Sequence, residues 1–272
     1  MYLLEKLPGT PNFFTPNTSG LQLLRRLPGG SQALLVQDRE GGRWVLKLNG
    51  NPQGNNVLAN EWLGSALGQY VGLPMPPSAE MYVPESFFDD ERAWFQLGSR
   101  RRRPQAGMHF ASRFFPDLNP RDVLHNLPSG FLKEGGNRSA VLGMLIFDVW
   151  ANHLDFRQML FSSPATSLNP TCCLFIDNGH LFGGPEWDIR LSPVRTRMSR
   201  EQQWILSTCN WDLICSWIHS FQCDLPEILE DLILRLPGEW YVGDKQQLYR
   251  SLTQRLIDLP TIIEQQIWLQ AS

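Results

Sequence analysis

The sequence lacks the residue patterns that mark disulfide-stabilised and zinc-stabilised proteins. It has five cysteines, an odd number, with Cys172 and Cys173 adjacent and no Cys-x-x-Cys pair. Its five histidines show no metal-ligand spacing. The sequence therefore predicts a reducing, cytoplasmic setting, with neither a disulfide framework nor a zinc ion.

Long apolar runs and an excess of basic charge are also missing. The longest apolar stretches, such as residues 140–151, are too short and too interrupted to span a bilayer. No charged-then-apolar leader opens the chain, so no secretory signal is expected. The net charge of −3 gives no basic footprint for a dedicated nucleic-acid binder. Neither a membrane nor a nucleic acid is an expected partner.

No internal repeat of 20 to 50 residues and no Gly-x-Ser-x-Gly motif occurs, which argues against solenoids, propellers and α/β-hydrolases. What is present is a composition typical of a globular protein, with 42% hydrophobic and 19% charged residues. The ten tryptophans predict large anchors in a hydrophobic core.

The order of apolar segments predicts an α+β protein with two lobes. Residues 1–20 are expected to form a loose or edge-packed N-terminal arm. The predicted elements are a β-hairpin at 33–36 and 43–48, a helix at 57–71, strands at 80–83 and 93–97, a loop at 107–113, an apolar helix at 139–151, strands at 159–161 and 172–176, and helices over 199–272 broken near Pro226, 237–238 and Pro260. The predicted domains are an N-terminal lobe at 1–98, a connector at 99–138 and a helical C-terminal lobe at 139–272.

The first candidate site joins the hairpin to the helix that follows it. Lys47 lies among apolar residues of the second hairpin strand, and Glu61 lies inside a mostly apolar helix. A buried lysine needs an anionic partner. A strand lysine paired with a helix glutamate holds the phosphates of ATP in protein kinases. The alternative is an ordinary edge-strand lysine.

A glycine-containing segment precedes the same hairpin. It consists of Gly29, Gly30, Ser31 and Gln32. Glycine allows close approach of the backbone, so the N–H groups of this segment could cover phosphates. The alternative is a simple turn.

The second candidate site lies around two short strands. Asp155, Arg157 and Gln158 follow the apolar helix, and Asp177 ends the next strand 22 residues after Asp155. Two carboxylates at neighbouring strand ends suit metal-assisted phosphoryl transfer, in which one orients the attacking hydroxyl and the other binds Mg²⁺. The alternative for residues 177–179, Asp-Asn-Gly, is a plain hairpin turn.

These motifs, in this order and spacing, resemble the HipA-like kinase family, in particular its short single-domain bacterial branch. The resemblance covers about residues 25 to 260. It rests on residues 29–33, 44–47, 54–61, 72–76, 107–113, 148–158, 175–179 and 186–187.

The resemblance implies a two-lobed, protein-kinase-like fold and ATP- and Mg²⁺-dependent phosphotransfer to a protein serine or threonine, or to the chain itself. Its implied roles are ATP-phosphate contact for Lys47, orientation of Lys47 by Glu61, phosphate covering by Gly29, Gly30, Ser31 and Gln32, catalysis by Asp155 with Arg157, and Mg²⁺ binding by Asp177 with Gln158. A separate regulatory chain is a further possible partner.

Two departures from the family pattern leave other functions open. Larger family members and ordinary kinases carry an asparagine five residues after the catalytic aspartate, and that position is Leu160 here. The short branch usually has a glycine directly after the aspartate, where this chain has the bulky Phe156. These residues motivate the alternative of a nucleotide-binding pseudokinase or interaction module without turnover. A small-molecule or lipid kinase is a third candidate. The four arginines at 100–103 are either a solvated face or an anion-binding or partner-docking patch.

Overall fold

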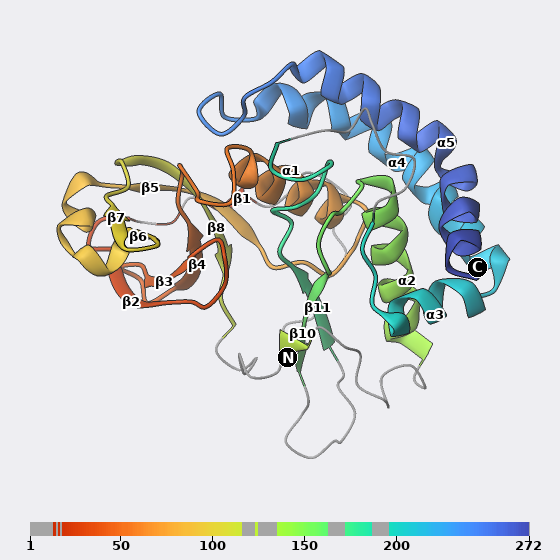
Figure 1. Ribbon diagram of the computed structural model, residues 1–272, viewed down its shortest axis with the longest axis horizontal. Helices are drawn as coiled ribbons and strands as arrows, with labels where there is room; N and C mark the ends of the chain where they lie inside the picture. Colours follow the sequence, from red (N-terminus) through yellow and green to blue (C-terminus); the bar gives the residue numbers. More distant parts are fainter. Residues whose placement is uncertain are drawn as a thin grey trace.

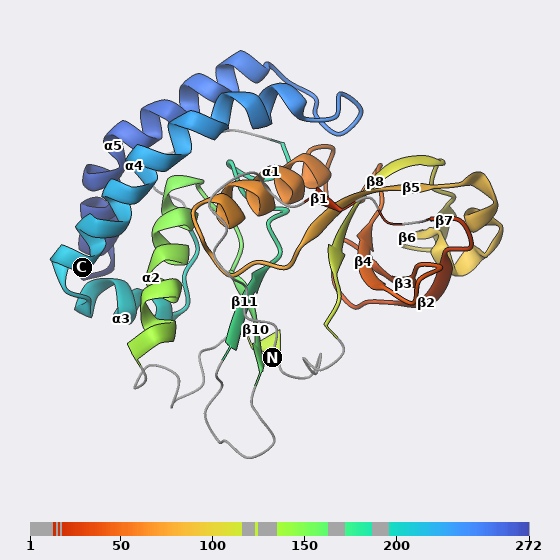
Figure 2. The same cartoon turned by 180° about the vertical axis from the view of Figure 1, so that it is seen from behind.

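The computed structural model describes residues 13–14, 16, 18–115, 123–124, 135–162, 172–186 and 196–271. Figures 1 and 2 show a β-sheet at one end, a group of helices at the other end, and helix α1 between them. The predicted α+β, two-lobed class is confirmed. The predicted N-terminal arm lies mostly outside the described residues.

A six-stranded sheet forms the first lobe. Its strands are β1 (Phe13–Phe14), β2 (Gln22–Arg26), β3 (Leu34–Gln37), β4 (Arg43–Lys47), β5 (Ser78–Val83) and β8 (Gly107–Arg113), in the order β1-β5-β8-β4-β3-β2. Strands β3 and β4 form the predicted hairpin, with Leu35 opposite Val45. Asp38 closes its turn, because the carboxylate accepts hydrogen bonds from the N–H of Gly42 and from Nε1 of Trp44 (2.6 and 2.7 Å).

Residues 107–113 are the central strand β8, so the loop predicted there is wrong. Strand β8 pairs antiparallel with both β4 and β5, and Phe110 lies opposite Lys47 on one side and Glu80 on the other. The flanking Gly107 and Arg113 weaken the local strand pattern, and pairing with distant segments on both sides overrides it. The sheet therefore continues beyond residue 98.

The arginine run lies on a small strand pair beside this sheet. After the short helices η1 (Glu85–Asp89) and η2 (Glu91–Ala93), strand β6 (Phe95–Leu97) pairs with β7 (Arg100–Arg102). The strand predicted at 93–97 is thus confirmed over its last three residues. Residues 100–103 are exposed, and Arg101 and Arg103 form local ion pairs with Glu91 and Asp89 (2.7 and 2.8 Å).

Helix α1 (Val57–Tyr70) confirms the helix predicted at 57–71. Residues 57–68 are all buried, which is typical of a helix that is enclosed on every side. Figure 1 shows α1 between the sheet and the C-terminal helices. Its polar residues Asn60, Glu61 and Ser65 are buried with it and need hydrogen-bonding partners.

The second lobe combines three short strands with four helices. They are β9 (Val123–Leu124), α2 (Gly135–Trp150), β10 (Gln158–Ser162), β11 (Cys172–Ile176), α3 (Arg200–Thr208), α4 (Trp211–Arg235) and α5 (Lys245–Ala271). Strand β10 pairs antiparallel with β9 and β11. Trp62, Trp150 and Trp240 are fully buried, as predicted, whereas Trp204 and Trp211 are half exposed. Within the described residues, no helix has the length and hydropathy needed to cross a bilayer.

Two of the three predicted breaks in the C-terminal helices are wrong. Helix α4 continues through Pro226 and α5 through Pro260, while the break near 237–238 is confirmed. A proline inside a helix leaves the carbonyl four residues earlier without its usual N–H donor. For Pro260 this carbonyl belongs to Leu256, and it accepts a hydrogen bond from Nε2 of Gln222 on α4 (2.8 Å). Packing between α4 and α5 thus compensates the helix-breaking residue.

Candidate active site

The buried ammonium group of Lys47 lies between two carboxylates. Strand β4 carries Lys47, helix α1 carries Glu61, and the turn after β11 carries Asp177. The Nζ atom of Lys47 contacts Oε1 of Glu61 and lies 2.9 Å from Oδ1 of Asp177. Burial disfavours the charged form, but Asp177 and Glu61 outweigh burial and raise the pKa of Lys47 above its ordinary value. The lysine is therefore a fixed positive charge where the two lobes meet.

Asp177 is held by both carboxylate oxygens. Its Oδ2 accepts a hydrogen bond from Nε2 of Gln158 on β10 (2.6 Å), while Oδ1 faces Lys47. Burial would raise the pKa of the Asp177 carboxyl, but Lys47 dominates and holds that pKa well below its ordinary range. The residue has a φ of 67°, in the left-handed region that non-glycine residues rarely adopt. Strained backbone of this kind is characteristic of functional turns.

Arg157 supports this turn from inside the protein. It is 1% exposed and forms a buried, two-pronged ion pair with Asp148 on α2. Its Nη1 also donates to the carbonyl of Ile176 (2.9 Å) and to Oδ1 of Asn178 (2.7 Å). All of these contacts are internal, so we assign Arg157 a positioning role in place of the catalytic role that the sequence suggests.

Helix α1 fixes the other side of the turn. The side-chain amide of Asn60 donates to the carbonyls of Gly179 (2.9 Å) and Leu181 (3.0 Å), and Asn178 donates to Oγ of Ser65 (3.1 Å). No role was predicted from the sequence for Asn60, Ser65, Asn178 or Asp148. For Asn60, Ser65 and Asp148, the signal that could have found them is a polar residue inside an apolar helix, which must have a buried partner.

Asp155 lies in the loop between α2 and β10. It is partly exposed, and its Oδ1 accepts a hydrogen bond from the N–H of Phe156 (2.8 Å). The preceding N–H, of Leu154, donates to the carbonyl of His180 (3.0 Å), which joins this loop to the Asp177 turn. Asp155 forms no ion pair with any described residue. Phe156 is 42% exposed, and its ring lies 5.8 Å from the guanidinium of Arg197.

The glycine-containing segment lies against the loop that follows β4. Asn51 donates to the carbonyl of Ser31 (3.0 Å), and a Cβ atom on Gly30 would lie 2.8 Å from Nε2 of Gln53. Gln53 in turn contacts His180 of the Asp177 turn (Nε2 to Nε2, 3.3 Å). The segment is thus connected to the Asp177 turn through one side chain.

Gln32 departs from its expected position. Its side chain bonds to the main chain of Gln96 on β6, with both distances 2.7 Å, and accepts a hydrogen bond from Arg26 (2.9 Å). The side chain therefore holds β6 against the sheet, and any contact of Gln32 with phosphate is left to its backbone.

The acidic groups suit a metal ion that takes some of its oxygen ligands from the protein and the others from a phosphate. Among the described residues, no three His, Cys, Asp or Glu side chains are grouped closely enough to form a complete metal site. Mg²⁺ requires only one or two carboxylates when substrate phosphates and water supply the other oxygens. Asp177 fits this requirement, and the Gln158 amide can present its oxygen by turning over. The donor set is therefore compatible with Mg²⁺ bound together with a nucleotide.

Comparisons with known proteins identify the fold. No family model matches the sequence, and no curated protein matches it. The structure is similar to hydra Fam20 with sugar (TM-score 0.56, 10% identity, covering 90% of this chain and 85% of that chain) and to the Golgi casein kinase (0.54, 11%, 96% and 76%). It is also similar to the Helicobacter pylori proinflammatory kinase CtkA (0.51, 11%, 88% and 95%).

A second structure of the Golgi casein kinase, with Mn and ADP bound, has a TM-score of 0.52 and 11% identity and covers 92% of this chain and 73% of that chain. At such low identities the likeness shows the fold alone. The chain therefore has a kinase-like fold of the type seen in Fam20 and CtkA, and none of these matches singles out the HipA-like family.

Proposed function

We propose that the chain is an ATP- and Mg²⁺-dependent phosphotransferase of the HipA-like type. Its acceptor is a protein serine or threonine, or the chain itself. The observation that carries the proposal is the cluster of Lys47, Glu61 and Asp177, which come from three separate elements and meet between the lobes. A cytoplasmic location and a separate regulatory chain stay predictions from the sequence.

In this function, Lys47 binds the phosphates of ATP and Glu61 orients it. The arriving phosphates give Lys47 a new anionic partner, which frees Oδ1 of Asp177. Asp177 and the oxygen of the Gln158 amide would then hold Mg²⁺, which neutralises charge on the phosphates. The backbone of residues 29–31 would cover the phosphates from the side of the sheet.

Asp155 orients the hydroxyl of the acceptor and receives its proton. As the acceptor oxygen bonds to the γ-phosphorus, the bond from that phosphorus to the oxygen bridging it to ADP breaks, and ADP leaves. Because Asp155 forms no ion pair with a described residue, its carboxylate is free to accept a hydrogen bond from a substrate. Arg157, held by Asp148, keeps the turn of Asp177 in place behind it.

A second function, nucleotide binding without turnover, is favoured by two observations. Both oxygens of Asp177 are already engaged, by Lys47 and Gln158. In addition, Leu160 stands where larger family members have an asparagine that could serve as a second metal ligand. These features leave fewer groups to hold the metal in a reactive arrangement.

The two functions are separated by measuring ATP binding and phosphate transfer on the same variants. ATP with Mg²⁺ is expected to raise the melting temperature, and radiolabelled phosphate is expected on protein. Asp155→Asn should lower transfer by about 10²- to 10⁴-fold with little change in binding. Asp177→Asn should remove the Mg²⁺ dependence of binding. The matched control is Asp258→Asn, because Asp258 is exposed and hydrogen-bonds to Gln254.

Binding without transfer in the wild type would favour the non-catalytic function. Phosphotransferase activity at this site is refuted if Asp155→Asn and Asp177→Asn both transfer phosphate as the Asp258→Asn control does.

A further inference from the structure

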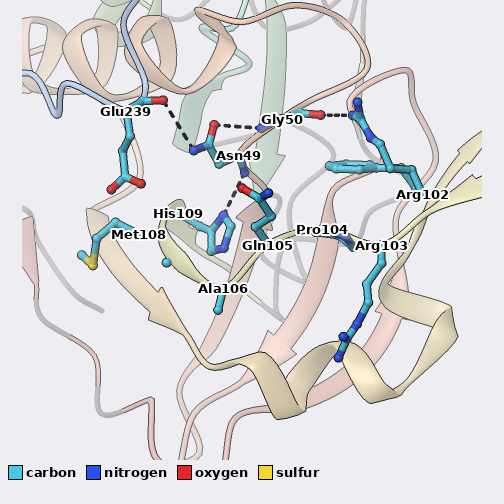
Figure 3. A pocket seen from close by; sticks show the side chains of 12 residues that line it. Asn49, Gly50, Arg102, Arg103, Pro104, Gln105, Ala106, Met108, His109 and Glu239 are labelled. Carbon is cyan, nitrogen blue, oxygen red and sulfur yellow. Dashed lines mark hydrogen bonds between the residues drawn. The ribbon is translucent and has the colours of Figure 1, made fainter.

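A cavity separate from the Asp177 turn lies between the end of β4, the start of β8 and the loop joining α4 to α5. It has a volume of about 310 Å³. Figure 3 shows the side chains around it. Its lining includes Asn49, Arg102, Gln105, His109 and Glu239, and it contains none of Lys47, Asp155 and Asp177.

The buried ring of His109 forms part of the cavity wall. The ring is 1% exposed, and its Nδ1 accepts a hydrogen bond from the N–H of Asn49 (2.8 Å). Burial lowers the pKa of His109 to about 4, against the weaker opposing effect of the Gln105 carbonyl. The ring is therefore neutral at pH 7, with its proton on Nε2. This Nε2 has almost no accessible surface, so the His109 ring shapes the wall of the cavity and leaves ligand contacts to the other lining residues.

The cavity also carries one positive and one negative group that lack a counter-charge. Arg102 lies over the ring of Phe95 (5.2 Å to its centre) and donates to the carbonyl of Gly50, but forms no ion pair with a described residue. The neighbouring Arg103, in contrast, is paired with Glu85 and with Asp89. The carboxylate of Glu239 likewise forms no ion pair within the described ranges.

The two charges are separated across the cavity. Figure 3 shows Arg102 and Glu239 at opposite sides, with Asn49, His109 and Gln105 between them. An anion alone would meet the repulsion of Glu239, and a cation alone would meet that of Arg102. A ligand with one charge of each sign satisfies both groups.

We propose that this cavity binds a small zwitterion of the amino-acid or dipeptide class. The ligand carboxylate accepts hydrogen bonds from Arg102, and the ligand ammonium group donates to Glu239. Hydrogen bonds between charged groups are about twice as strong as neutral ones, which favours this orientation. The volume lies at the lower end of the range for ligand pockets, which limits the ligand to this size.

The test uses four zwitterions whose two charges are progressively further apart: glycine, β-alanine, γ-aminobutyrate and glycylglycine. Calorimetry and thermal shift on the full chain are expected to detect binding of at least one of them at or below about 10 mM. For glycylglycine, the matched probes are N-acetylglycylglycine and glycylglycinamide, each of which lacks one charge. If glycylglycine binds, each of these probes is expected to bind at least tenfold more weakly than glycylglycine. If another of the zwitterions binds, its N-acetyl and amide forms are expected to show the same tenfold loss of affinity.

Variants locate the binding. Arg102→Gln and Glu239→Gln should each weaken it at least tenfold, whereas Arg101→Gln and Glu230→Gln, exposed controls on β7 and α4, should not. Asp155→Asn should bind the zwitterion as the wild type does, so failure of the proposed phosphotransfer leaves this result intact. The proposal is overturned if no zwitterion binds, if the singly charged probes bind equally well, or if Arg102→Gln and Glu239→Gln bind like the wild type. Glu239 is exposed and its carboxylate makes no hydrogen bond to the described residues, so Glu239→Gln should fold normally.

Discussion

The Nζ atom of Lys47 lies 2.9 Å from Oδ1 of Asp177, although 130 positions separate the two residues in the sequence. The same Nζ also contacts Glu61 on α1. One ammonium group therefore connects the sheet, the enclosed helix and the turn after β11. Removing it would leave two carboxylates in a poorly hydrated site without a cation.

The first prediction follows from this arrangement. Lys47→Met should lower the free energy of unfolding by about 3–5 kcal/mol, the usual cost of breaking a buried ion pair by removing one partner. Adding Glu61→Gln should restore part of that loss, because it removes one of the unpaired charges. Urea denaturation of the two single variants and the double variant measures this coupling.

For comparison, Lys245→Met removes a lysine that hydrogen-bonds the carbonyls of Leu234 and Leu236, and it should cost only about 1 kcal/mol. The account of the cluster fails if Glu61→Gln destabilises the Lys47→Met background as much as it destabilises the wild type.

The second prediction concerns acid stability. Burial gives His109 a folded-state pKa of about 4 against its ordinary value of 6.5, so the unfolded chain binds a proton at higher pH than the folded chain does. Stability should therefore fall as the pH decreases from about 6.5 to about 4, by at most about 3 kcal/mol from this residue. His109→Asn, whose Oδ1 can still accept the Asn49 N–H, should lose less stability over that window. Equal pH dependence in both proteins would contradict the neutral, buried state of His109.

The third prediction compares two arginine–aspartate pairs. Arg157→Ala leaves Asp148 buried and unpaired, and should cost about 3–5 kcal/mol. Arg235→Ala removes an exposed pair with Asp231 on α4 and should cost less than about 1 kcal/mol. Both are measured by urea denaturation. Similar losses in the two variants would mean that the buried Arg157 pair contributes no more to stability than an exposed pair.

The fourth prediction tests how α5 tolerates Pro260. Gln222→Leu should cost about 1–3 kcal/mol, because the carbonyl of Leu256 loses its donor. Pro260→Ala restores a backbone N–H to that carbonyl, so Gln222→Leu should cost much less in the Pro260→Ala background. A double-mutant cycle by thermal or urea denaturation measures the difference, and additive losses would show that the hydrogen bond does not compensate the proline.

The parts of the fold that were predictable are those with a strong local pattern. Two short apolar segments around a polar turn identified the hairpin of β3 and β4, and the apolar spacing of α1 identified the helix, and with them Lys47 and Glu61. Strand β8 was missed because its hydrogen bonds come from β4 and β5, distant segments that its own residues do not reveal. The continuation of α5 through Pro260 was missed because proline is a local signal, while Gln222 acts from another helix.

The residues of the candidate site divide in the same way, into those with a local sequence signal and those that depend on distant contacts. The turn residue Asp177 was identifiable from its position after a strand, because strand ends often carry functional carboxylates. The positioning roles of Asn60, Asn178 and Arg157 depend on contacts between α1, α2 and the turn, which no spacing in the sequence encodes. The cavity beside Asn49 is lined in part by Glu239, which is 190 positions away in the sequence, so no local pattern predicts it.

A crystal structure of the protein with a non-hydrolysable ATP analogue and Mg²⁺ tests the central claim most directly. The account predicts the triphosphate against Lys47, with one divalent ion shared between its oxygens and Asp177, and with Asp155 facing the γ-phosphate. An analogue bound elsewhere, or a triphosphate at this position with its metal ion remote from Asp177, would contradict it.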